Sequence, residues 1–549
     1  AKPVVSRVEV QAGRQTRTVT GNSPVTSHQL TLTQLAHRRI HLVTLLDGDG
    51  PTLRRSADHE LDSFFNYAPL PWPESRSGPA RIAREILARS GIDRGLCLVV
   101  GLTDGRLAES LAASGRLSVV AVAIDRKKVD AIRARLLAAG HYGRRLTIRH
   151  VASLGRLSLP GQWANLVVCE SLQGDGILPT TAAEITAQLR PDGGVACIGQ
   201  APNSQKPLAA DRLKNWLGPL TKTARLEGDP SGGLWATWTR GPLKGSGDWS
   251  HLYGHADNTA FAGEQLSGVR KSSDLAVQWV GRPGPRYQPD RNGRKPSPLS
   301  TAGRLFLQGL HRVIAVDAFN GSILWSLEIP DLERFNMPRD CGNWCADRDF
   351  LYVAIRDRLW QIDVRNGKVV KQWPVPEPQG RSGPWDWGYI ARTEDRIIGT
   401  AVRRATSWTN YWGGAGAGWY DARSGEVTHK VCSDALFSID RKTGKVTWQY
   451  SNGVVLNTTL TIKGDKIYFV ECRHEAVIGA PERRVGRPEL WKKMFLVAMD
   501  ANSGSMLWER PLDLPPGKVV FSMAQAGDKL VIAGSADGKY NVHSFKTAN

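Results

Sequence analysis

The residues best suited to chemistry form a glycine-containing turn and a carboxylate in the first half of the chain. Residues 96–100 are an apolar run typical of a buried strand, and the turn Gly101-Leu-Thr-Asp-Gly105 follows them. A second apolar run, 117–124, ends at Asp125. Glycines let a ligand approach the backbone, and an acid roughly 20 residues further on can bind ribose hydroxyls. The spacing predicts a nucleotide-like ligand held by Gly101, Thr103, Gly105 and Asp125.

Helices and strands must alternate around this turn to position it. The pattern predicts helices over 80–90, 106–114 and 127–139, and further strands over 146–151, 164–169 and 194–198. This alternation is typical of a Rossmann-like, doubly wound parallel sheet, which binds ligands beyond the carboxyl ends of its strands. Glu170 directly follows the strand predicted over 164–169, so we expect its carboxylate at that crevice.

The order of these segments resembles the class I S-adenosylmethionine-dependent methyltransferases over residues 78–240. The loop 99–105, the strand end Ala123-Ile-Asp125 and the turn Leu189-Arg-Pro-Asp-Gly-Gly-Val195 carry the resemblance. It implies S-adenosylmethionine as the cofactor. Methyl transfer needs an aligned nucleophile and, for some acceptors, a base. Glu170 is the candidate catalytic base.

The chain departs from that family's pattern in the binding loop. The family's loop reads (Asp/Glu)-x-Gly-x-Gly-x-Gly, whereas Val99 stands at the acid and Thr103 at the middle glycine. Ala152 and Ser153 follow the third strand, where the family often has an acid beside the adenine. These departures predict a degenerate domain that serves as a platform, and an active S-adenosylmethionine-dependent methyltransferase is the alternative.

A short phrase, Asp-x-x-(Asn/Thr/Ser)-Gly, recurs four times in the second half, at Asp317, Asp363, Asp440 and Asp500. A Trp follows each copy, at Trp325, Trp373, Trp448 and Trp508. Each copy lies between alternating apolar runs, so it predicts a strand, a tight turn and a second strand. Repetition on this scale indicates a β-propeller.

The copies at Ala315 and Ala498 most closely resemble the PQQ-like propeller repeat, Ala-x-Asp-x-x-Thr-Gly-x-x-x-Trp. Four copies, and a fifth beginning at 546–549, are fewer than the seven or eight blades expected of that family, so we expect a propeller truncated at the C-terminus. A quinoprotein oxidoreductase, the second alternative, needs calcium-binding acids and an adjacent Cys-Cys pair. The chain has no Cys-Cys dipeptide, and its closest pair is Cys341 and Cys345. PQQ is therefore not expected as a cofactor.

The predicted organisation has four parts. Residues 1–77 are assigned no fold, 78–240 form the methyltransferase-like domain, 241–265 a linker and 266–549 the propeller. The Gly/Pro-rich stretch 241–248 marks the junction. This arrangement resembles a family of large bacterial multidomain proteins.

The linker contains His251, His255 and Asp257, which could share a metal on one face of a helix. Gly254 between the histidines disfavours that helix, so no metal site is predicted. The favoured interpretation is an ordered segment that seals the start of the propeller.

Charge and aromatic residues indicate the partner class. The formal net charge is +20, without a block of like charges, so we expect affinity for anionic polymers but no dedicated nucleic-acid site. Aromatic residues and glycines gather in 385–420, which could present a platform to a protein or polymer, although blade core plus one long loop explains the same residues.

These features predict a multidomain α/β plus all-β chain that acts as a binding or interaction protein. No apolar run is long enough to span a bilayer. PQQ-like propellers are commonly exported, so a periplasmic or secreted location is expected. An active methyltransferase would instead be cytoplasmic, where its cofactor is made.

Overall fold

A computed structural model describes residues 6–12, 15–21, 40–43, 78–114, 116–143, 145–202, 204, 206–229, 233–266, 268–280, 297–309, 312–329, 332, 342–406, 429–517 and 520–548. The chain divides into two compact units, Ala1–Pro71 and Trp72–Asn549. The first unit contains a three-stranded antiparallel sheet of order β2-β1-β3, built from β1 (Ser6–Ala12), β2 (Gln15–Gly21) and β3 (Ile40–Val43). No helix in the described ranges is long and apolar enough to cross a membrane.

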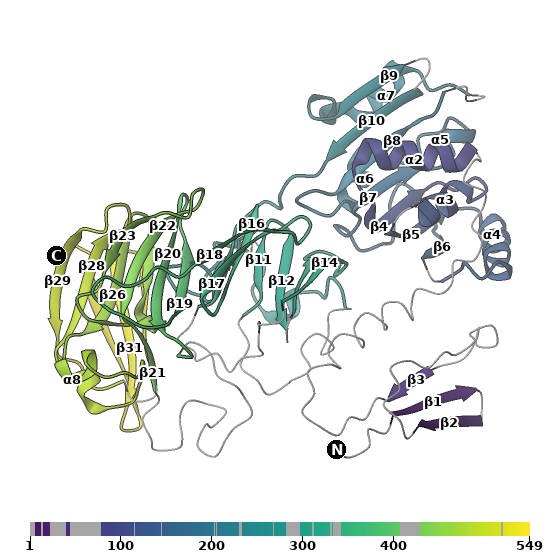
Figure 1. Ribbon diagram of the computed structural model, residues 1–549. Helices are drawn as coiled ribbons and strands as arrows, with labels where there is room; N and C mark the ends of the chain where they lie inside the picture. Colours follow the sequence, from purple (N-terminus) through teal and green to yellow (C-terminus); the bar gives the residue numbers. More distant parts are fainter. Residues whose placement is uncertain are drawn as a thin grey trace. The chain divides into compact units, whose positions relative to one another are not determined.

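The second unit begins with a seven-stranded sheet of order β6-β5-β4-β7-β8-β10-β9. Its strands are β4 (Arg94–Val100), β5 (Arg116–Ala123), β6 (Leu146–His150), β7 (Leu166–Cys169), β8 (Val195–Gln200), β9 (Arg225–Asp229) and β10 (Gly233–Thr239). The first five are parallel, and β10 is antiparallel to its neighbours β8 and β9. The Rossmann-like prediction is confirmed (Figure 1).

Two apolar layers cover this sheet, because its parallel strands are buried on both faces. The helices are α2 (Gly78–Ser90), α3 (Arg106–Ser114), α4 (Arg126–Ala138), α5 (Ser171–Gly174), α6 (Ala182–Gln188) and α7 (Ala210–Leu217). Strand order reverses between β4 and β7, which marks the switch point where such folds bind ligands. The loop after β4 and the residue after β7 are therefore the functional positions to inspect.

Five antiparallel sheets follow in chain order, as expected for propeller blades (Figure 1). The first contains β11 (Leu299–Thr301), β12 (Arg304–Gly309), β13 (Arg312–Asp317) and β14 (Ile323–Glu328). The second contains β15 (Trp344–Ala346), β16 (Phe350–Ile355), β17 (Arg358–Asp363) and β18 (Val369–Pro374). The third contains β19 (Trp385–Arg392), β20 (Arg396–Arg403), β22 (Ala435–Asp440) and β23 (Val446–Tyr450).

The fourth sheet is larger, and the fifth is smaller. The fourth has the order β27-β21-β24-β26-β28-β29, with β25 also paired to β26. Its strands are β21 (Lys430–Ser433), β24 (Val454–Leu456), β25 (Thr461–Lys463), β26 (Lys466–Cys472), β27 (Arg484–Val485), β28 (Met494–Asp500) and β29 (Met506–Leu512). The fifth contains only β30 (Phe521–Ala526), β31 (Lys529–Ala536) and β32 (Lys539–Lys546).

The repeated phrase forms the turn between the third and fourth strands of a sheet, and its Trp joins that sheet to the next one. The indole N–H of Trp325 donates to the carbonyl of Val364 at 2.7 Å, and that of Trp448 donates to Ala501 at 3.0 Å. Each acceptor directly follows the turn Asp of the next sheet. The turn glycines have positive φ, and a Cβ on Gly504 would come within 2.5 Å of the Trp448 ring. The repeat therefore locks neighbouring sheets together.

The first turn Asp differs from the others, because it contacts the Rossmann-like sheet. Asp317 is fully buried, and its carboxylate lies 2.8 Å from Arg190 Nε and accepts a hydrogen bond from Asn165 at 2.9 Å. Asn320 of the same turn also donates to Asn165, at 2.8 Å. Burial raises the pKa of Asp317. The first blade is thus anchored by Asn165, which directly precedes β7, and by Arg190, which follows α6.

Candidate functional site

The loop after β4, at the switch point, is engaged by a side chain of the protein itself. Glu170 is 2% exposed, and its carboxylate turns back onto the loop that follows β4. Oε1 accepts hydrogen bonds from the backbone N–H groups of Thr103 at 3.3 Å, Asp104 at 3.1 Å and Gly105 at 2.7 Å. It also accepts from the Thr103 hydroxyl at 2.9 Å. Oε2 lies 3.4 Å from the N–H of Ala108 in α3.

These contacts use the donors that a ligand of this loop would need. The amides at the start of a helix, with the dipole of α3 behind them, are the natural anion site of such a fold. The Glu170 carboxylate fills that site from within. Burial raises its pKa, while the Thr103 hydroxyl and the Gly105 amide oppose that shift. Glu170 thus acts as a hydrogen-bond acceptor for the loop, and its role as catalytic base stays a prediction.

The four predicted cofactor-binding residues are placed differently. Gly101 and Gly105 have φ of 71° and 79°, which favours glycine, and a Cβ on Gly101 would come within 2.6 Å of the Ser171 hydroxyl. Thr103 is engaged by Glu170. Asp125 is exposed at the end of β5 and caps α4 by accepting from the N–H of Lys128 at 3.0 Å. The structure brings Thr103, Gly105 and Glu170 together and gives Asp125 a local capping role.

The sequence did not reveal that Glu170 binds the loop. Its partners are more than 60 residues earlier in the chain, and they are mostly backbone groups that carry no sequence signature. One signal was available. Val99 is at the position where the family's loop pattern has an acid. A carboxylate at the end of a neighbouring strand can accept hydrogen bonds from the loop's backbone N–H groups instead.

The predicted linker contains a segment that packs against all five propeller sheets. We call residues 249–258 the cross-blade segment. Its backbone exchanges hydrogen bonds with Ser300 of β11, and its carbonyls accept from Ala346 of β15, Ile462 of β25 and Gln525 of β30. His251 Nε2 accepts from the N–H of Arg392 in β19 at 3.1 Å. The segment thus contacts a strand of each sheet in chain order, which extends the sealing role expected for it.

The histidines of this segment are used as hydrogen-bonding groups. His251 Nδ1 lies 2.8 Å from the Ser250 hydroxyl, so both of its ring nitrogens have protein partners. Burial lowers the pKa of His251 to about 3, with Arg392 adding to the effect. His255 Nδ1 lies 3.3 Å from the same hydroxyl. No cluster of three metal-ligating side chains occurs among the described residues.

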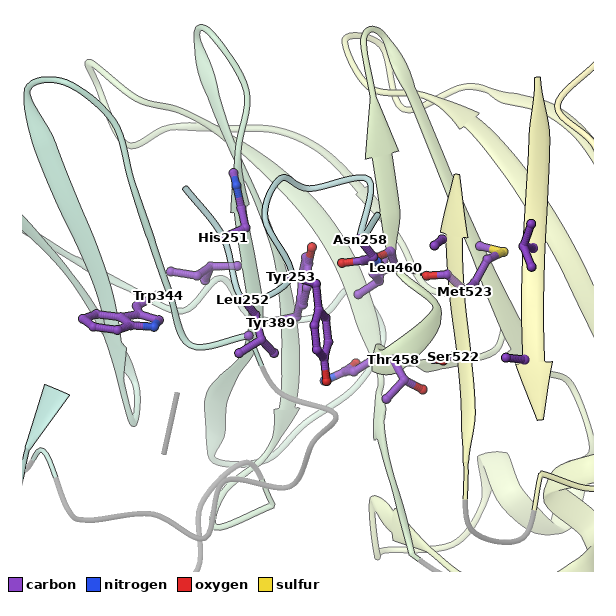
Figure 2. A pocket seen from close by; sticks show the side chains of 16 residues that line it. His251, Leu252, Tyr253, Asn258, Trp344, Tyr389, Thr458, Leu460, Ser522 and Met523 are labelled. Atoms are coloured by element: carbon purple, nitrogen blue, oxygen red, sulfur yellow. Dashed lines mark hydrogen bonds between the residues drawn. The ribbon is translucent and has the colours of Figure 1, made fainter. Parts of the chain in front are cut away.

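A cavity of about 320 Å³ lies between the cross-blade segment and three of the sheets (Figure 2). Tyr253, Trp344 and Tyr389 supply its aromatic surface, and Asn258, Thr458 and Met523 lie on the opposite side. The described residues of its lining include no Asp, Glu, Lys or Arg. A calcium-bound quinone with several carboxylates needs such groups, so these residues do not fit PQQ.

Two buried donors border the same cavity. The indole nitrogen of Trp344 and the amide nitrogen of Asn457 have no hydrogen-bond partner within the described part of the chain. An acceptor such as water or a hydroxyl group would satisfy them. The cavity therefore suits a small neutral molecule better than an ionic cofactor.

The aromatic stretch 385–420 is only partly described. Trp385 and Trp387 lie in β19 and are 4% and 2% exposed, so they belong to the blade core and offer no platform. Trp408, Trp412, Trp419 and Tyr420 lie outside the described residues. Cys341 also lies outside them, and Cys345 is a buried free thiol.

No family model and no curated protein matches the chain. Solved structures similar to parts of it include methyltransferases and β-propellers. A SAM-dependent methyltransferase from Aquifex aeolicus is 13% identical over 30% of this chain and 94% of its own, with a TM-score of 0.24. An RNA methyltransferase from Salinibacter ruber, in complex with S-adenosyl-L-homocysteine, is 16% identical over 31% and 95%, with a TM-score of 0.21. BamB from Moraxella catarrhalis is 14% identical over 56% and 85%, with a TM-score of 0.24.

Proposed function

We propose that this chain is a non-catalytic binding protein, in which a degenerate methyltransferase-like domain supports a β-propeller of PQQ-like repeats. The observation that carries the proposal is the Glu170 carboxylate in the glycine loop. A bound S-adenosylmethionine would have to displace the buried Glu170 carboxylate from several hydrogen bonds. The displaced carboxylate would then need new hydrogen-bond or ionic partners.

The loop residues also fit the cofactor poorly on charge grounds. Val99 takes the place of the acid, and it is fully buried in β4. Asp125 remains available for a ribose, but one exposed carboxylate gives little affinity by itself. The domain keeps its fold because its two apolar layers are intact. It serves as a platform to which the first propeller turn is anchored through Asp317.

Binding is assigned to the propeller, which contains the cavity beside the cross-blade segment. The partner class we propose is a protein or an anionic polymer, and the net charge of +20 supports the second. A periplasmic or secreted location fits this function, since it requires no cytoplasmic cofactor.

Isothermal titration calorimetry with S-adenosylmethionine and S-adenosylhomocysteine tests the proposal. Wild type is expected to give no saturable heat with either compound. Asp125→Ala is the matched control, because it removes the ribose-binding candidate without touching Glu170. Saturable binding by wild type that Asp125→Ala abolishes would overturn the proposal in favour of a working methyltransferase.

A further inference from the structure

The cavity beside the cross-blade segment is bordered by two deeply buried side chains that each keep a hydrogen-bond donor unused. Trp344 in β15 is 1% exposed and Asn457 is 2% exposed, and both line the cavity. The indole nitrogen of Trp344 and the amide nitrogen of Asn457 have no partner within the described ranges of the chain. The Asn457 oxygen is already used, because it accepts from the Ser433 hydroxyl. Since a buried donor is costly when unpaired, these two groups indicate a ligand that brings acceptor oxygens.

The opposite wall of the cavity offers an acceptor and hydroxyl groups. The amide nitrogen of Asn258 donates to the carbonyls of Leu460 at 2.7 Å and Met523 at 3.2 Å. The Asn258 oxygen therefore lies on the other side of the amide, where it faces the cavity (Figure 2). Thr458 and Ser522 also line the cavity, and their hydroxyl groups can donate or accept. Donors on one wall and acceptors on the other suit a ligand that carries several hydroxyl groups.

Aromatic rings form much of the remaining surface. Tyr253 is 42% exposed and Tyr389 is 8% exposed, so the first ring is open to a ligand and the second is fixed in the blade. Flat rings of this kind pack against the apolar face of a ligand, while a few polar groups fix its orientation. A charged ligand would lose its hydration here without gaining an ionic partner from the described lining residues. The surface therefore favours a neutral ligand with one apolar face.

Aromatic walls can also bind a quaternary ammonium ion. Such a cation offers no acceptor to the nitrogens of Trp344 and Asn457, so both donors would stay unpaired. The volume of about 320 Å³ narrows the ligand further. It is near the lower end of the range of about 300 to 1,000 Å³ that is usual for ligand sites, which leaves room for one small ring rather than for a polymer.

We propose that this cavity binds a neutral, polyhydroxylated ring of the size of a monosaccharide. The apolar face of the ring packs against Tyr253 and Tyr389. Its oxygens accept from the Trp344 indole and the Asn457 amide, and one of its hydroxyl groups donates to the Asn258 oxygen. The site does not depend on the anionic polymer proposed above as a partner, because the two ligands differ in charge and in size.

NMR of the tryptophan indole groups tests the contact directly. The protein is labelled with isotopic nitrogen in its tryptophans and titrated with D-glucose, N-acetyl-D-glucosamine and myo-inositol in turn. At least one of these compounds is expected to shift the indole signal of Trp344 in a saturable way. Trp344→Phe assigns that signal by removing it. Trp385→Phe is the matched control, because Trp385 is buried in β19 but does not line the cavity, and the signal it removes should be one that does not shift.

Calorimetry on the full chain measures the affinity with the same three compounds. Trp344→Phe keeps an aromatic ring but loses the donor, so it should weaken binding by roughly three- to tenfold. Trp385→Phe should bind like wild type. Ala533→Phe fills the cavity and should abolish binding, with circular dichroism as the check that it folds; if it does not fold, Trp344→Phe decides the result.

Three results would overturn the proposal. The first is the absence of saturable binding with all three neutral compounds. The second is tighter binding of D-gluconate or choline, which would assign the cavity to a charged ligand. The third is an affinity that Trp344→Phe leaves unchanged, because the unpaired indole donor would then play no part in recognition.

Discussion

Glu170 shows how one side chain can engage the hydrogen-bond donors of a glycine-containing loop. Its carboxylate satisfies backbone N–H groups that would otherwise be unpaired in the crevice, at distances of 2.7 to 3.4 Å. A buried carboxylate is costly unless it is well hydrogen-bonded, and here it is. We propose that the same contacts that stabilise the loop also exclude an anionic ligand from it.

Replacing Glu170 with Ala should therefore destabilise the protein without creating activity. We expect the free energy of unfolding to fall by about 2 to 4 kcal/mol, because several buried amides lose their acceptor. Asp125→Ala, which removes an exposed helix cap, should cost about 1 kcal/mol. Urea denaturation followed by circular dichroism measures both. Equal effects of the two substitutions would show that Glu170 does not hold the loop.

His251 predicts a pH dependence of stability. Its pKa is lowered to about 3 in the folded protein by burial, against about 6.5 when unfolded. The unfolded state therefore binds more protons between these values, so stability falls as pH decreases through this window. The contribution has a slope of up to about 1.4 kcal/mol per pH unit.

Thermal unfolding at several pH values from about 4 to about 8, a range that spans the unfolded-state pKa of about 6.5, checks this. His251→Gln should be less stable than wild type near neutral pH and should lose less stability on acidification. An unchanged acid dependence in His251→Gln would mean that other groups cause it.

At the scale of elements, the turn and the Trp form a repeated joint between sheets. The turn glycines Gly367, Gly444 and Gly504 have positive φ, and a Trp ring from the preceding sheet lies directly over each of them. A side chain at the glycine would be strained by the backbone and would collide with the ring. Both halves of this joint are encoded in the short repeated phrase.

Gly504→Ala and Gly527→Ala separate these two effects. Both glycines have positive φ, 73° and 61°, but only Gly504 lies under a ring, that of Trp448, while nothing lies within 4 Å of a Cβ on Gly527. We expect the free energy of unfolding, measured with denaturant, to fall by about 1 kcal/mol in Gly527→Ala. In Gly504→Ala it should fall by about 1 to 3 kcal/mol more, because the new methyl group collides with the ring. Equal losses would refute the packing role of the Trp.

The sequence predicted elements better than the contacts between them. Helix and strand positions from 78 to 200 follow from local apolar periodicity, and the turns follow from the repeated Asp and Gly. The five contacts of the cross-blade segment join residues far apart in the chain, so no local pattern marked them. The contact of Trp279 with the first turn was also missed, in which its indole N–H donates to the carbonyl of Ala318 at 2.9 Å. The pair Gln278-Trp279 repeats Gln372-Trp373 of the fourth strand β18.

At the scale of the whole molecule, the chain combines a Rossmann-like domain and propeller sheets. Its formal charge of +20 accompanies a cavity whose described lining residues are neutral, so the surface and the cavity suit different ligands. A surface with this charge attracts polyanions at long range, and salt screens that attraction.

Retention on a heparin column should therefore be strong at low salt and should be lost as sodium chloride rises. We expect elution well above physiological ionic strength if the basic residues act together. A cation-exchange resin that carries simple sulfonate groups is the control for bulk charge. Flow-through at low salt would contradict the proposal of an anionic polymer as partner.

Hydrogen exchange of the glycine loop tests the central claim most directly. The amides of Thr103, Asp104 and Gly105 are measured by mass spectrometry or NMR, with and without S-adenosylmethionine. If Glu170 occupies the loop, these amides are protected in the free protein, and adding the compound leaves their exchange unchanged. Fast exchange in the free protein that slows on adding S-adenosylmethionine would contradict the account.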